Sequence, residues 1–154
     1  MARKEELREK VITARQRLND AIQALADDDW DCATTNPEWS ARDILTHLSV
    51  AEPGLLARMN LILEGKSQLP PGFDLNVYNT RQVAKKKGAA VAELAYSLAA
   101  SREKLLLFLD ELPDASLDIR GWHASGREVT VAEMLQILAG HEESHAADIL
   151  TAKH

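Results

Sequence analysis

The most informative segment of the chain lies near its C-terminus, where Thr130–Lys153 reads TVAEMLQILAGHEESHAADILTAK. Thr130 is followed three positions later by Glu133, and this pair matches a capping box, so a helix is predicted to begin here. Apolar residues then recur at the spacing of one helical face. The inward-facing stripe is Met134, Leu138, His141 and His145. Two histidines therefore continue an apolar line.

Histidines four positions apart on a helix point to the same side and can bind one metal ion together. His141 and His145 have this spacing. A buried imidazole pair without a metal would leave several ring nitrogens in need of hydrogen-bond partners. The alternative is a pair of core histidines whose nitrogens are satisfied by the protein. The segment alone leaves both interpretations open.

The same periodicity predicts three further helices. The first covers residues 3–26, and Arg15 lies off its apolar stripe. The third begins near Leu75 and continues to about Leu112, with a bend or short break at Lys85–Gly88. The lysines of that segment are predicted to form a solvated face.

The second helix is predicted from Ala41 to Glu64, behind a capping box formed by Ser40 and Asp43. Pro53 lies inside it and is expected to kink or distort it. His47 lies three positions after an inward isoleucine and four before an inward alanine, so it can face the core.

Four helices without strand-like alternation predict an all-α four-helix bundle, formed as a single domain over residues 1–154. The long connection at 113–129 contains Trp122 and His123. Connections of this length are often functional. We therefore expect these two residues either to line the mouth of a pocket or to belong to a surface loop that closes one end of the bundle.

Charge and composition exclude several classes of function. The net charge is −6 and there is no basic block, so nucleic-acid binding has no electrostatic support. No apolar run approaches the length of a membrane span. The charged N-terminus does not resemble a signal peptide, and the one cysteine, Cys32, cannot form an internal disulfide. These features predict a cytoplasmic protein in which Cys32 is an inert thiol.

Three of the five histidines occupy inward helical positions, namely His47, His141 and His145. His123 lies in a connection and His154 is the last residue. Metal sites in helix bundles are built from side chains on facing helices. Three neutral imidazoles with an open fourth position are typical of a catalytic zinc rather than a closed structural one. Such a metal can activate water or bind a thiolate.

Two short motifs carry a family resemblance. They are Trp39–His47, which reads WSARDILTH, and the terminal H-x-x-x-H of His141 and His145. The segment Phe73–Asn79, FDLNVYN, and the helix order extend the match over essentially the whole chain. On this basis the sequence resembles the DinB-like family of four-helix bundles, the DNA-damage-inducible type that also includes thiol-dependent transferases.

The resemblance implies an antiparallel bundle in which His47, His141 and His145 hold a divalent metal ion. Zinc or nickel is the first expectation, with iron and manganese as alternatives. The resemblance also implies a homodimer. It implies a hydrolase or a thiol-dependent transferase that acts on a small molecule, with a low-molecular-weight thiol as co-substrate in the second case. The alternative is a non-enzymatic stress-response or binding module with a structural metal.

The segment from His141 to His145 also fits H-E-x-x-H, the helix signature of zinc peptidases. Those enzymes usually take a third ligand downstream, where only His154 follows, so a peptidase is not favoured. Glu142 occupies the position of their general base and is a candidate to take a proton from metal-bound water. The alternative is that Glu142 and Glu143 form the polar border of an apolar face or pair with a neighbouring helix.

Overall fold

The computed structural model describes residues 2–152. The helices are α1 (Arg3–Ala24), α2 (Ala41–Leu63), α3 (Leu75–Lys85), α4 (Val91–Glu111) and α5 (Val131–Ile149). Two short 3₁₀ turns cover Asp27–Asp29 and Asp114–Asp118, and a small hairpin is formed by β1 (Arg120–Trp122) and β2 (Glu128–Thr130). The predicted all-α fold is confirmed, with this hairpin as an addition.

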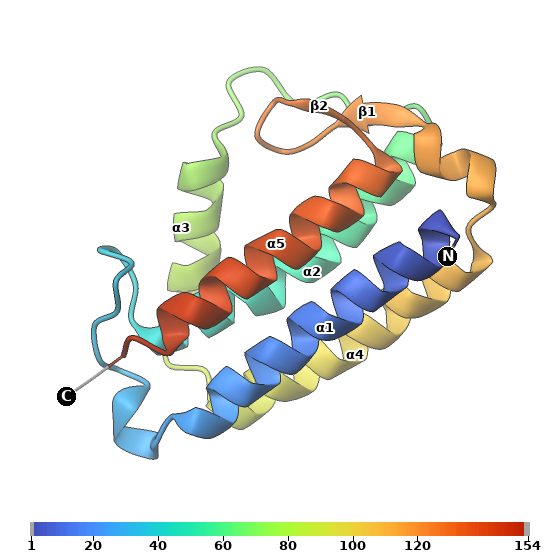
Figure 1. The fold of residues 1–154 in the computed structure, drawn as a ribbon. Coiled ribbons are helices and arrows are strands. Elements are labelled where there is room, and N and C mark those ends of the chain that lie inside the picture. Colours follow the sequence, from blue (N-terminus) through green and yellow to red (C-terminus); the bar gives the residue numbers. More distant parts are fainter. Residues whose placement is uncertain (1, 153–154) are drawn as a thin grey trace.

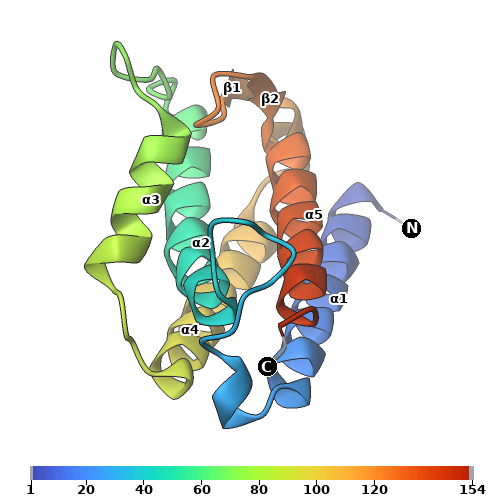
Figure 2. The ribbon, with the colours of Figure 1, turned by 90° about the vertical axis from the view of Figure 1, so that its left-hand side faces the viewer.

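Four long helices, α1, α2, α4 and α5, form the bundle, and α3 lies outside it against α2 (Figure 1 and Figure 2). α5 contacts α1 and α2, and α4 also contacts α1 and α2. α1 and α5 run in one direction, whereas α2 and α4 run in the other (Figure 1). The four-helix bundle therefore contains two parallel neighbouring pairs, α1–α5 and α2–α4, and two antiparallel ones.

The predicted break in the third helix is confirmed, and it separates two helices. α3 ends at Lys85 and α4 begins at Val91. Gly88 has a φ of 83°, a left-handed conformation that favours glycine and cannot continue a right-handed helix. Because α3 carries the chain back along the outside of α2, α4 can run parallel to α2.

The connection at 113–129 is more ordered than the sequence indicated. Gly121 pairs with Val129 in the antiparallel hairpin, and the turn between the strands uses Gly126 at a φ of 90°. The expectation of no strand was wrong here because strands of three residues are too short to show alternation. The hairpin leads directly into α5.

Both predicted capping boxes are present. The Asp43 backbone N–H donates to Ser40 Oγ at 3.2 Å, and the Glu133 N–H donates to Thr130 Oγ1 at 3.0 Å. These contacts satisfy amides that have no partner inside the helix, and they define where α2 and α5 begin. α2 continues without interruption through Pro53 to Leu63.

The apolar core consists of two clusters, one toward each end of the bundle. The hairpin-side cluster contains Val11, Met59, Leu105, Leu109, Met134 and Leu135, among others. The opposite cluster contains Leu18, Ile44, Leu45, Leu98 and Ile149, among others. On each long helix, one buried charged residue lies between the residues that belong to the two clusters.

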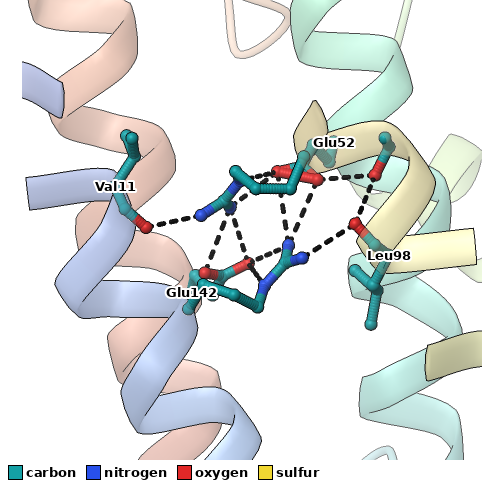
Figure 3. A network of polar contacts seen from close by, with 7 residues as sticks. Val11, Glu52, Leu98 and Glu142 are labelled. Atoms are coloured by element: carbon teal, nitrogen blue, oxygen red, sulfur yellow. Dashed lines mark hydrogen bonds and ion pairs between the residues drawn. The ribbon is translucent and has the colours of Figure 1, made fainter. Parts of the chain in front are cut away.

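These four residues form a charged belt made of Arg15, Glu52, Arg102 and Glu142, one each from α1, α2, α4 and α5 (Figure 3). Arg15 Nη2 lies 2.8 Å from Glu142 Oε1 and 3.1 Å from Glu52 Oε1. Arg102 Nε lies 2.7 Å from Glu52 Oε2, and its Nη2 lies 3.0 Å from Glu142 Oε1. Each carboxylate therefore contacts both guanidinium groups.

The arginines also donate to backbone carbonyls, Arg15 to Leu98 and Arg102 to Val11. None of the four belt residues exposes more than 9% of its surface. Burial alone would lower the pKa of Arg15, but its hydrogen bond and charge interaction with Glu142, supported by Glu52, raise it. The position predicted for Arg15 outside the inward stripe is thus wrong, because buried ion pairing overrides the apolar pattern.

Candidate metal centre

Three histidines from two facing helices meet at one point beside the charged belt. His47 is on α2, and His141 and His145 are one turn apart on α5. α2 and α5 are antiparallel neighbours, so an inward residue near the start of α2 meets inward residues near the end of α5. The structure therefore brings together the three residues that the sequence singled out.

The Nε2 atoms of the three rings converge. His141 Nε2 lies 3.0 Å from His47 Nε2 and 3.1 Å from His145 Nε2. One nitrogen from each ring lies within 4.8 Å of the others. Nitrogens bound to a tetrahedral zinc at about 2.0–2.1 Å lie about 3.3 Å apart. The donor atoms thus fit a single metal ion after small ring rotations.

The environment keeps these rings neutral, as metal ligands must be. Burial, followed by repulsion from His145, lowers the pKa of His47 to about 4. Burial, followed by repulsion from His145, His47 and His123, lowers the pKa of His141 to about 3. Burial also lowers the pKa of His145, against the raising effect of Asp148. Each neutral ring therefore has one nitrogen without a proton, which is available to bind a metal ion.

Two further residues surround the histidines. The Trp39 ring lies 4.8 Å from the His47 ring and 6.3 Å from the His145 ring, between centroids, so it covers one side of the cluster. Asp148 Oδ2 lies 3.4 Å from His145 Nδ1, without the alignment of a hydrogen bond. A carboxylate beside the second nitrogen of a ligating histidine commonly orients the ring. Sequence reasoning cited Trp39 only as the first residue of a family motif, and it missed Asp148.

Glu142 contacts other helices. Its carboxylate accepts hydrogen bonds from Arg15 and Arg102 in the charged belt. Glu143 forms an ion pair with Arg17 at 2.9 Å on the exposed side. Both glutamates thus pair with a neighbouring helix, as the alternative prediction had it. No contact in residues 2–152 brings Glu142 to the histidines, so the general-base role gains no support from the structure.

A cavity of about 350 Å³ opens beside two of the three histidines. His47 and His141 form part of its wall, and most of the remaining wall is apolar. α3 and the segment before it cover the cavity through Leu69, Pro70, Phe73, Leu75, Tyr78 and Asn79. Volumes of this order lie at the small end of the range for small-molecule sites.

The hairpin turn contributes His123 to the same cavity, together with Ala124. The prediction for 113–129 is therefore half right, because Trp122 is absent from the cavity wall and is 38% exposed. Arg58 of α2 also lines the cavity. Sequence reasoning did not single out Arg58, and it cited Tyr78 and Asn79 only as part of the segment that extends the family resemblance.

Comparison with protein families agrees with this arrangement. The family model for the DinB superfamily matches residues 11–149, which cover most of α1 and all of α2, α3, α4 and α5. The chain belongs to the DinB superfamily. The resemblance expected from the two motifs is thereby confirmed.

Three known proteins are similar to this chain, one in sequence and two in structure. A protein of Oceanobacillus iheyensis, named "Putative metal-dependent hydrolase OB0413", is 24% identical over 143 residues, covering 93% of this chain and 81% of its own. YfiT from Bacillus subtilis, described as "a probable metal-dependent hydrolase with an unusual four-helix bundle topology", superimposes with a TM-score of 0.79 at 18% identity. That match covers 95% of this chain and 83% of YfiT.

The sibling lethal factor precursor DfsB gives a TM-score of 0.75 at 19% identity, covering 95% of this chain and 92% of DfsB. At such low identities the two structural matches establish the fold alone. In residues 2–152, none of the helices is both long and apolar enough to cross a membrane.

Proposed function

We propose that this DinB-superfamily chain is a metal-dependent hydrolase of small molecules, in which His47, His141 and His145 bind one divalent metal ion through Nε2. The observation that carries the proposal is the convergence of the Nε2 atoms of three neutral histidines, two of which line a mostly apolar cavity. A structural metal site is usually closed by four protein ligands, whereas three ligands leave a position for water or substrate.

A divalent metal held there would supply Lewis acidity and a bound water of lowered pKa. The protein contributes the surroundings. Leu55, Phe73 and Ile137 restrict water around a substrate. His123 adds a polar group that can donate a hydrogen bond to it. The charged belt connects α5 to α2, because both arginines contact Glu142 of α5 and Glu52 of α2.

Several finer expectations belong to this proposal. We keep zinc or nickel as the metal, because imidazole ligands suit both, with iron and manganese as alternatives. A thiol-dependent transferase with a low-molecular-weight thiol co-substrate is the second candidate reaction, since an open metal position can also bind a thiolate. A homodimer and a location in the cytoplasm remain predictions from the sequence and the family.

The test is a screen of small esters, amides and lactams with the purified protein in three states: as purified, after chelation, and after reloading with Zn²⁺ or Ni²⁺. Hydrolysis that disappears on chelation and returns on reloading is expected, and His47→Ala should abolish it. A parallel screen with glutathione, mycothiol or bacillithiol and electrophiles tests the transferase. A metal-loaded protein inactive in both screens would favour a binding module with a structural metal.

A further inference from the structure

Arg58 lies on the cavity wall at a distance from the histidines. It follows His47 by eleven positions on α2, which is about three turns, a rise of about 16 Å and nearly the same helical face. Both side chains line the same cavity. The cavity therefore extends from the histidine cluster at one end to a cation at the other.

The guanidinium of Arg58 is fixed on one edge and free on another. Its Nη1 donates to the Ser67 carbonyl at 2.7 Å and to the Trp122 carbonyl at 2.8 Å. Within residues 2–152, neither Nε nor Nη2 has a hydrogen-bond partner, and no carboxylate oxygen lies within 4.0 Å of Arg58. The Nε–H and one Nη2–H point in parallel, which is the geometry that binds a carboxylate with two hydrogen bonds.

A second donor lies on the same cavity wall. The Ser125 backbone N–H donates to His123 Nδ1 at 3.0 Å, and Ser125 Oγ lies 2.8 Å from the same atom. Because Nδ1 accepts, the neutral ring carries its proton on Nε2. Burial, then the positive charges of Arg127 and Arg58, lower the pKa of His123, which is consistent with its lying near Arg58. The ring thus provides an N–H donor beside a cation.

We infer that the substrate is a small apolar compound that bears a carboxylate, bound by the Nε–Nη2 edge of Arg58 and assisted by His123 Nε2–H. Its apolar body would lie along Leu55, Phe73 and Ile137, and its reactive group would reach the histidine end. Arg58 is partly buried, and its unpaired N–H groups beside an apolar wall can form charge-assisted hydrogen bonds with an anion. The reaction at the histidine end rests on the proposed function. The binding of the carboxylate by Arg58 does not depend on it.

The experiment compares two probes of the same shape, 4-phenylbutanoate and its neutral amide. Their dissociation constants are measured by titration calorimetry or protein NMR, for the protein as purified and after chelation. The variants are Arg58→Gln, Arg58→Lys and, as a control, Arg81→Gln, which removes an exposed cation of α3 outside the cavity wall. The informative quantity is the ratio of the two constants, since loosening of the hairpin would weaken both probes alike.

The wild-type protein and Arg81→Gln should prefer the carboxylate by about tenfold or more, the scale of a charge-assisted hydrogen bond. Arg58→Gln should bring the ratio close to one, and Arg58→Lys, which keeps the charge without the two-pronged edge, should give an intermediate ratio. An equal preference in wild type and Arg58→Gln would overturn the inference, as would failure of the wild type to bind either probe at millimolar concentration. The ratio measured in the chelated protein tests anion binding by Arg58 independently of any metal-dependent activity.

Discussion

His141 and Glu142 are consecutive in α5, but their side chains belong to different sites. The His141 ring meets His47 of α2 with 3.0 Å between their Nε2 atoms. The Glu142 carboxylate meets Arg15 of α1 at 2.8 Å. One residue along a helix is a rotation of about 100°. α5 can therefore present a metal ligand to one neighbour and an ion-pair partner to another within a single turn.

This relationship predicts the effect of Glu142→Gln. A neutral amide would leave the two belt arginines short of one negative charge, and breaking a buried ion pair typically costs about 3–5 kcal/mol. We expect the free energy of unfolding to fall by about that amount in denaturant titrations, while the metal content of the folded protein stays unchanged. Glu143→Gln is the matched control, since its exposed pair with Arg17 should contribute under about 1 kcal/mol. A stable Glu142→Gln protein that loses hydrolysis would instead make Glu142 a general base.

How well the sequence predicts each part of this structure depends on how far apart in the sequence the interacting residues lie. The capping boxes at Ser40 and Thr130 use contacts three residues apart, so local pattern locates the starts of both helices. The inward position of His47, His141 and His145 follows from helical periodicity. Their meeting then requires only that two apolar faces pack together.

The charged belt and the substrate cavity depend on tertiary contacts. Arg15 and Glu142 are 127 positions apart, and periodicity assigns a charged residue to the surface by default. Arg58 and His123 likewise lie far apart in the sequence, and Arg58 reaches the hairpin through its hydrogen bond to the Trp122 carbonyl. Neither site has a short-range signature, so their roles became visible only in the structure.

Trp39 should report metal binding. Its ring lies 4.8 Å from the His47 ring, so fixing that ring by coordination changes the surroundings of the indole. Titration with Zn²⁺ or Ni²⁺ should change the tryptophan emission and saturate at one equivalent. Trp39→Phe should remove most of the change, and Trp122→Phe, which alters an exposed ring of the hairpin, should retain it. The interpretation fails if Trp39→Phe keeps the full response.

Gly121 is predicted to be essential for the position of the hairpin. A Cβ atom there would lie 2.5 Å from Ser67 Oγ and 2.6 Å from Ile62 Cγ1. Gly121→Ala should therefore destabilise the protein by about 1–3 kcal/mol, the usual cost of overpacking, as measured by thermal or denaturant unfolding.

The matched control is Gly140→Ala in α5. A Cβ at Gly140 meets nothing within 4 Å, and alanine favours the helix interior by about 1 kcal/mol over glycine. This variant should be at least as stable as the wild type. Equal stability of the two variants would show that the hairpin can move away from α2 at no cost.

The most direct test of the account is the metal stoichiometry of the folded protein, measured by inductively coupled plasma mass spectrometry after equilibration with Zn²⁺ or Ni²⁺ and removal of free ions. We predict one ion per chain in the wild type and in His123→Ala, which alters a cavity histidine outside the cluster. His141→Ala should lose most of its metal, because two imidazoles hold a divalent ion poorly. A wild-type protein without stoichiometric metal, or a His141→Ala variant that retains it fully, would contradict the three-histidine centre.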